Sequence, residues 1–243
     1  HKIPMEKIRL SKRMSELGLC SRREADGYIE KGLVEVDGEI VSELGSKVYP
    51  TQQVTLRTAA QNAQQQRVTI LLNKPVGYTC STKDPGRVVY DLLPERFRYR
   101  NPVLSTVGRL DRDTSGLLML TDDGQLLHRI ISPKAELPKI YEVELAEDLR
   151  GDEAELFASG TLLLESEKTP LAPAVMEVID ARHARLTLIE GRYHQVKRMF
   201  AATGNRVLSL HRSKTGNLDL SGLEPGQWRV VPREEAEAKL LNL

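Results

Sequence analysis

The 243-residue sequence lacks the features by which several classes of protein are recognised. Its two cysteines, Cys20 and Cys80, form no disulfide framework and no metal-ligand spacing, which favours a reducing, cytoplasmic environment. No apolar run is long enough to cross a membrane, and no secretory leader is recognisable. Hydrophobic residues make up 40% and charged residues 28%, as in ordinary globular proteins.

The sequence also lacks the common cofactor and metal motifs. There is no GxxxxGK[ST] phosphate loop, no GxGxxG after a strand, no zinc-deaminase signature and no GxSxG elbow. The five histidines include no pair at metal-binding spacing. We therefore expect no metal and no organic cofactor, and a site built on carboxylates remains.

Charge is distributed unevenly although the net charge is only +1. The window Gly191–Leu218 contains basic residues and no Asp or Glu. Such a window indicates an anionic partner, with a solvated helix face as the alternative.

Residues 1–57 are predicted to form a small separate module. Ser21 and Glu24 have the spacing of a capping box and predict a helix that begins there. Asp37-Gly38 predicts a tight hairpin between two short strands. The basic residues of the module lie on or beside its helices, where they suit phosphate oxygens or serve as solubilising charge. They are Lys12, Arg13, Arg22 and Arg23.

The module also resembles a known family. The stretch RLSKRMSELGLCSRREADGYIEKGLVEVDGEIV is similar to the RNA-binding domain first named for ribosomal protein S-four. That resemblance implies two helices followed by a hairpin, and binding to structured RNA.

Residues 58–66, TAAQNAQQQ, are small and polar and predict a flexible linker, in which a short helix would have nothing to bury. Residues 67–243 show many strands with interspersed helices and no regular βαβ order. This pattern predicts an α+β fold with a larger, mainly antiparallel mixed sheet.

The stretch GRLDRDTSGLLML, from Gly108 to Leu120, places two carboxylates before an apolar strand. Asp111 and Asp113 are therefore candidate reactive groups, and at least one needs a cation partner because like charges repel. The alternative is structural: Asp, Thr and Ser can cap backbone amides in such a turn.

The larger segment resembles pseudouridine synthases of the Rsu type. The resemblance rests on GRLDRDTSGLLMLTDDG, on Lys139-Ile140-Tyr141, on EGRYHQVKRM from Glu190, and on LLNKPVGY from Leu71. It implies a catalytic domain that isomerises uridine to pseudouridine, with Asp111 as the catalytic aspartate. Attack on the sugar C1′ and abstraction of the 2′ proton remain alternatives.

The resemblance also implies roles for other residues. Tyr141 is expected to stack on a flipped-out base, and Lys197 or Arg198, with a slight preference for Arg198, to pair with Asp111. Further residues are expected to contact the substrate or to form the wall of its pocket. They are Arg109, Leu188, Arg192 and His194. For Leu188, packing in the core is an equal alternative.

The predicted substrate is ribosomal RNA, with the 16S RNA of the small subunit as the preferred candidate. We expect the protein to bind this RNA within a ribosomal assembly intermediate. The alternatives are a 23S RNA enzyme of the same family and a non-catalytic RNA-binding assembly factor. We expect a cytoplasmic monomer with no membrane partner.

Overall fold

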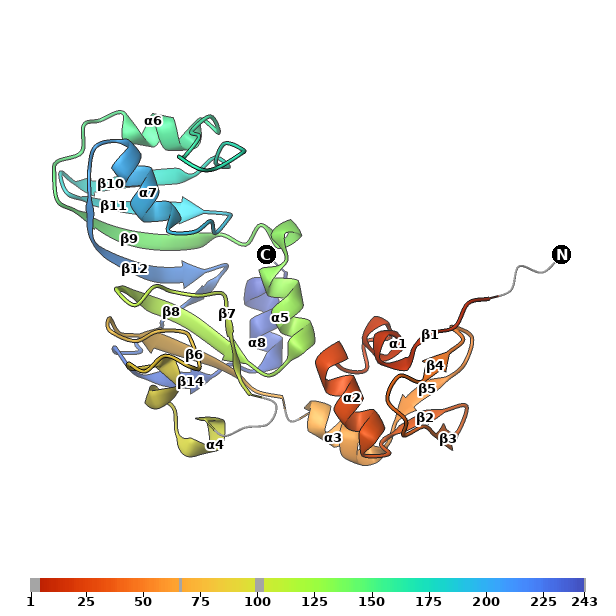
Figure 1. Cartoon of the computed structure of the whole chain (residues 1–243). Coiled ribbons are helices and arrows are strands. Elements are labelled where there is room, and N and C mark those ends of the chain that lie inside the picture. Colours follow the sequence, from red (N-terminus) through yellow and green to blue (C-terminus); the bar gives the residue numbers. More distant parts are fainter. Residues whose placement is uncertain (1–4, 66, 99–102, 243) are drawn as a thin grey trace. The chain divides into compact units, whose positions relative to one another are not determined.

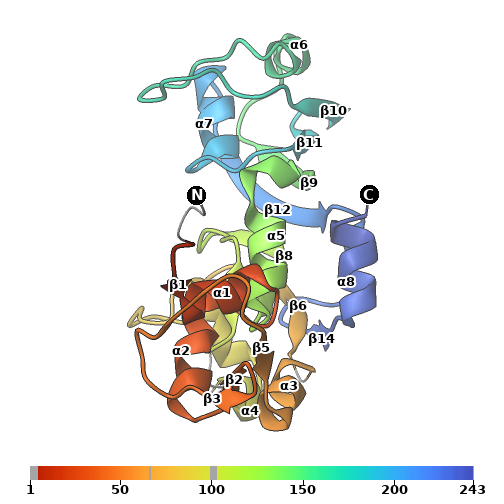
Figure 2. The same cartoon turned by 90° about the vertical axis from the view of Figure 1, so that its right-hand side faces the viewer.

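The computed structural model describes residues 5–65, 67–98 and 103–242, which form two compact units. The first unit comprises the chain up to Val68 together with Thr121–His128, and the second comprises the remainder. Figures 1 and 2 show the elements of both units. Within the described ranges, no helix has the length and apolar character needed to cross a membrane.

The first unit contains short helices and two small sheets. In chain order its elements are β1 (Ile8–Arg9), α1 (Leu10–Glu16), α2 (Arg22–Glu30), β2 (Val34–Val36), β3 (Glu39–Ile40), β4 (Lys47–Val48), β5 (Val54–Leu56) and α3 (Thr58–Gln65). The sheets are β1-β4 and β3-β2-β5, and all their described pairings are antiparallel.

The local signals of this unit are confirmed. Ser21 accepts a hydrogen bond from the amide of Glu24, whose carboxylate accepts one from the amide of Ser21. Asp37 and Gly38 both have positive φ, at 51° and 82°, as a type I′ turn between β2 and β3 requires. Buried side chains such as Leu10, Met14 and Ile29 join the helices to the sheets in one apolar core.

The segment predicted as a flexible linker, with a short helix allowed but nothing for it to bury, is a helix with a buried residue. Residues 58–65 form helix α3, and Gln66 lies outside the described residues. Ala60 is fully buried in the core of the first unit, so the expectation that this segment has nothing to bury is wrong. The buried methyl group of Ala60 and the hydrogen bond of 2.9 Å from Gln61 to the carbonyl of Leu56 anchor the helix, and composition alone hides such anchors.

The second unit contains one large sheet with helices around it. Its elements are β6 (Thr69–Lys74), the 3₁₀ turn η1 (Val89–Leu92), α4 (Glu95–Arg98), β7 (Ser105–Val107), β8 (Thr114–Thr121), α5 (Gly124–Ile131), η2 (Pro133–Ala135), β9 (Lys139–Leu145), α6 (Glu153–Ala158), β10 (Val175–Asp180), β11 (His183–Leu188), α7 (Gln195–Ala202), β12 (Val207–Thr215), β13 (Leu218–Asp219), β14 (Trp228–Val230) and α8 (Arg233–Leu240). The end of β8 and the start of α5 belong to the first unit.

The nine-stranded sheet has the order β10-β11-β9-β12-β8-β6-β14, with β13 beside β12 and β7 beside β8. Strands β8 and β12 pair in parallel, whereas β12 pairs antiparallel with β9 on its other edge. The α+β fold with a mainly antiparallel sheet is thus confirmed.

Helices α6 and α7 cover the half of this sheet formed by β9, β11 and β12. Phe157 of α6 and Phe200 of α7 pack edge to face, with ring centroids 5.2 Å apart. Both belong to an apolar core that includes Val143, Leu186 and Leu210 from the strands. This core fixes the position of α7, which carries part of the basic window.

Gly116 marks the parallel contact between β8 and β12. It lies opposite Arg212 in the register and has a φ of +113°. A Cβ at this position would be 2.7 Å from the amide nitrogen of Arg212 and closer still to its carbonyl oxygen. Only glycine therefore allows the two strands to approach this closely.

We predict that Gly116→Ala destabilises the second unit by about 2 kcal/mol or more, because it adds backbone strain and a backbone clash. Urea unfolding monitored by circular dichroism measures this. Gly27→Ala is the control: Gly27 lies inside α2 with no atom within 4 Å of an added Cβ, so it should be neutral or stabilising. Equal unfolding midpoints for Gly116→Ala and wild type would contradict the account.

Candidate active site

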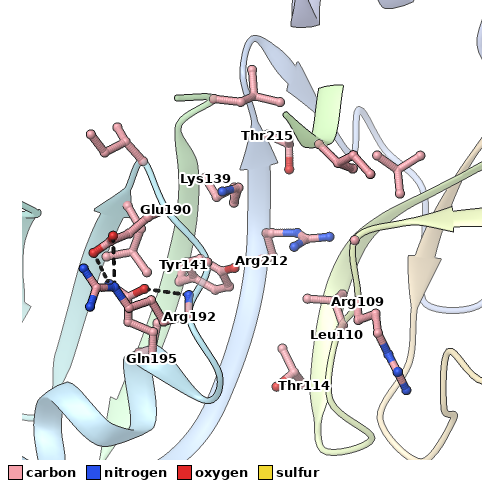
Figure 3. Close-up of a pocket in the computed structure, with 18 of the residues that line it drawn as sticks. Arg109, Leu110, Thr114, Lys139, Tyr141, Glu190, Arg192, Gln195, Arg212 and Thr215 are labelled. Carbon is pink, nitrogen blue, oxygen red and sulfur yellow. Dashed lines mark hydrogen bonds and ion pairs between the residues drawn. The ribbon is translucent and has the colours of Figure 1, made fainter. Parts of the chain in front are cut away.

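A cavity of about 560 Å³ opens in the second unit beside the β7–β8 turn. Its walls are this turn, the paired strands β9 and β12, the end of β11 and the segment that leads into α7. Figure 3 shows Tyr141 and Arg212 between the turn that carries Arg109 and the segment that carries Arg192. A cavity of this size suits a ligand as large as one nucleotide.

Asp111 lies in the turn between β7 and β8. Gly108 has a φ of 72° and starts this turn, and the carbonyl of Asp111 accepts a hydrogen bond of 3.0 Å from the amide of Thr114. The side chain of Asp111 lines the cavity and is 39% exposed. The turn thus presents the carboxylate to a ligand while the backbone is held by the sheet.

A buried lysine binds backbone carbonyl oxygens of this turn. The ammonium of Lys74 donates to the carbonyl oxygens of Thr114 at 2.7 Å, Pro75 at 3.1 Å and Arg112 at 3.3 Å. Its side chain is fully buried, and burial lowers the pKa of Lys74. A buried cation bonded to carbonyls on both sides of Asp113 restrains the loop that carries Asp111.

Two side chains from the α7 region, an imidazole and an ammonium, contact Asp111. The Oδ2 atom of Asp111 is 3.3 Å from Nε2 of His194 and 3.3 Å from Nζ of Lys197. Lys197 also donates to Asp113 at 2.8 Å. That hydrogen bond holds the pKa of Asp113 below its usual value. Burial lowers the pKa of Lys197, but the two carboxylates outweigh burial and leave that pKa raised.

The backbone at the start of α7 orients His194 and Lys197 toward Asp111. His194 has a left-handed backbone, with a φ of 47°, and directly precedes the helix. Gln195 is buried, and its side chain accepts a hydrogen bond of 3.0 Å from the amide of Arg192. The amide of Gln195 in turn donates to the carbonyl of Arg192 at 3.1 Å, and these two hydrogen bonds close the turn that precedes the helix.

The preference for Arg198 as the partner of Asp111 is wrong in this structure. Arg198 donates to the carboxylate of Glu167 at 3.2 Å and to the carbonyl oxygens of Glu165 at 2.6 Å and Tyr193 at 3.0 Å. The helix turns about 100° per residue, so neighbouring side chains point to different sides. Lys197 therefore reaches the aspartates, and Arg198 reaches the 165–170 segment.

Arg192 also bonds to that segment. Its guanidinium donates to the carbonyl oxygens of Thr169 at 2.8 Å and Pro170 at 2.7 Å and to Glu190 at 3.2 Å. It lines the cavity, but most of its donors are used within the protein. Substrate contact by Arg192 or Arg198 stays a prediction.

Tyr141 and Leu188 both line the cavity. Tyr141 on β9 is half-buried, and Leu188 on β11 is buried in the apolar core while it lines the cavity. Arg109 is exposed, and its guanidinium points away from Tyr141 in Figure 3. The wall of the site is thus aromatic and apolar beside the carboxylate.

Two further cations of the cavity were not among the predicted site residues. Arg212 on β12 is buried, lies opposite Tyr141 in the register, and donates to the carbonyl of Leu117 at 2.9 Å. Lys139 lies two residues before Tyr141 on the same face of β9. The alternation of side chains along β9 could have placed Lys139 on the same face as Tyr141. Nothing in the sequence distinguished Arg212 from the other residues of the basic window.

The basic residues of the first unit lie on its helices as predicted. Lys12 and Arg13 are on α1, where both pair with Glu16, and Arg22 and Arg23 occupy the first turn of α2. The last two are exposed and have no ion pair with any residue that the structure describes. They are free to meet an anion at the helix start.

Comparison with known proteins agrees with this architecture. A profile of the RNA pseudouridylate synthase family matches residues 68–202, and an S4 domain profile matches residues 8–54. The ribosomal small subunit pseudouridine synthase A of Escherichia coli is 44% identical over 230 residues, which cover 94% of this chain and 98% of the relative. The protein of that name from Yersinia pestis is 43% identical over 233 residues, covering 94% and 96% of the two chains.

A solved structure described as a pseudouridylate synthase superimposes with a TM-score of 0.71 at 38% identity. The match covers 96% of this chain and 100% of that one. Since the family profile spans more than half of the sequence and relatives of this similarity match nearly end to end, the chain belongs to the RNA pseudouridylate synthase family.

Proposed function

We propose that this protein isomerises a uridine of small-subunit (16S) ribosomal RNA to pseudouridine, with Asp111 as the catalytic group. The observation that carries the proposal is the ionic cluster of Asp111, His194 and Lys197 at a nucleotide-sized cavity. The small-subunit assignment is supported by relatives of that name that match almost the whole chain.

The chemistry fits a carboxylate held between cations. Breaking the bond between the sugar C1′ and the base develops positive charge on the sugar, which a nearby carboxylate stabilises or captures. Both attack on C1′ and removal of the 2′ proton need an ionised Asp111. His194 and Lys197 both contact the Oδ2 atom of Asp111.

The base must leave its stack to reach Asp111, and Tyr141 offers it an aromatic surface in the cavity. The reaction is an isomerisation and is redox-neutral, so the proposal requires no organic cofactor.

The first unit supplies the second contact with RNA. We place ribosomal RNA against Lys12, Arg13, Arg22 and Arg23, whose exposed members begin or flank helices. We propose that the protein acts as a cytoplasmic monomer on a ribosomal assembly intermediate, with residues 1–57 as the RNA-binding domain, 58–66 as the connection and 67–243 as the catalytic domain.

We predict that Asp111→Asn lowers the rate by about 10³-fold or more, as loss of a catalytic group does. The measurement is tritium release from 16S RNA labelled at carbon 5 of uridine. Asp113→Asn removes the same charge two residues away and should lower the rate by less than about tenfold, because Lys197 is its one ion-pair partner among the residues that the structure describes. A wild type inactive on 16S RNA, or an Asp111→Asn variant as active as wild type, would refute the proposal. Release from 23S RNA instead would reassign the substrate.

We further predict different outcomes for the two neighbouring cations of α7. Lys197→Met should lower the single-turnover rate by about 10-fold to 100-fold, because two adjacent carboxylates lose their shared cation. Arg198→Met should mainly lower the melting temperature, because it frees the carbonyl oxygen of Glu165 and the carboxylate of Glu167. A larger rate loss in Arg198→Met than in Lys197→Met would show that the ion pair seen here is not the working one.

A further inference from the structure

The inner end of the cavity contains a cation without a partner. Lys139 begins β9, is half-buried and lines the cavity. Its ammonium makes no hydrogen bond or ion pair with any residue in the described part of the chain. It lies 3.9 Å from the place where a Cβ on Gly191 would stand, so the glycine leaves this ammonium uncovered.

The surroundings make this charge unfavourable in the empty site. Burial, and then the positive charge of Arg212, lower the pKa of Lys139, while Glu190 acts in the opposite direction. The Glu190 carboxylate is already engaged by Arg192 at 3.2 Å and by the amide of Ala172 at 2.9 Å. A half-buried cation beside a second cation is stabilised when an anion enters.

A second polar group lies beside Lys139 without a partner. Thr215 is opposite Lys139 in the β9–β12 register, is 6% exposed and lines the cavity. Its hydroxyl is buried and has no hydrogen-bond partner among the described residues. Figure 3 shows Thr215 and Lys139 on adjacent strands at the same end of the site. An unpaired buried hydroxyl costs free energy that an incoming oxygen atom would offset.

We propose that Lys139 stabilises the negative charge on the uracil base once its bond to C1′ has broken, an inference that rests on the proposed function. When that bond breaks, its electron pair stays on the base, which becomes an anion shared between nitrogen 1 and the two carbonyl oxygens. The base then bonds to C1′ through carbon 5, loses the proton of carbon 5 and gains one at nitrogen 1. Lys139 keeps its own proton and acts only through charge.

The strand geometry places this charge within reach of the base. Lys139 and Tyr141 point to the same face of β9, and residues two apart on a strand are separated by about 7 Å. A base stacked on Tyr141 therefore turns one edge toward the Lys139 ammonium. Asp111 has its own partners in His194 and the Lys197 ammonium, so the two charges that separate in the reaction would meet different groups.

The test compares two RNA substrates. 16S transcripts made with uridine or with 5-fluorouridine are reacted with wild type and with Lys139→Met under single-turnover conditions, and carbon-linked nucleosides are measured by mass spectrometry after digestion. Fluorine withdraws electrons and stabilises the departed base without help from Lys139. The single-turnover rate of Lys139→Met should be about 10²-fold below that of wild type with uridine, which is the cost of losing one preorganised charge contact. With 5-fluorouridine the reduction in rate should be markedly smaller. Lys139→Arg should recover most of the rate with uridine.

Lys134→Met is the matched control. Lys134 lies on η2, is exposed and lies outside the cavity lining, so its loss should affect both RNAs equally. Equal losses with both RNAs in Lys139→Met, or a change in RNA affinity in place of rate, would overturn the inference and assign Lys139 to a backbone phosphate. If Lys139→Met does not melt cooperatively, Lys139→Gln replaces it in the same comparison.

The outcome for wild type separates this inference from the proposed function. A wild type that produces no carbon-linked nucleoside from the uridine transcript contradicts the function itself. If wild type is active and Lys139→Met lowers the rate by the same factor with both RNAs, only the role of Lys139 is contradicted.

Discussion

The site depends on the pairing of strand β12 along both of its edges. Its parallel edge with β8 places Arg212 beside the turn that carries Asp111, and its antiparallel edge with β9 places Tyr141 beside Arg212. The parallel edge requires Gly116, which leaves room for the backbone of β12. The cavity is therefore a consequence of sheet order, and its reactive groups come from segments far apart in the sequence.

The distribution of charge within the cavity follows from this arrangement. The carboxylate of Asp111 is compensated by His194 and Lys197, which the start of α7 supplies. The other end of the cavity has Lys139 and Arg212 on neighbouring strands. A reaction that leaves positive charge on a sugar and negative charge on a base is matched by such a polarised site.

The basic window of the sequence divides into two groups that net charge cannot distinguish. Arg192 and Arg198 bind backbone carbonyl oxygens of the 165–170 segment, which lies before the window in the chain. Lys197 contacts Asp111 in the β7–β8 turn. Arginine has several donors in a fixed fork and suits the clustered carbonyls, whereas the single ammonium of lysine suits a point contact with carboxylates.

The sequence by itself determined the local features of the fold and pointed to Asp111 as the catalytic group that we propose. The capping box of Ser21 and the turn at Asp37 depend on neighbouring residues, so their types and spacing suffice, and the ordered motifs singled out Asp111. Tertiary structure decided the buried anchor of Ala60, the choice of Lys197 over Arg198, and the positions of Lys139 and Arg212. Each of these depends on which surface a side chain faces after distant segments have packed together, and that information is absent from the spacing of residues along the chain.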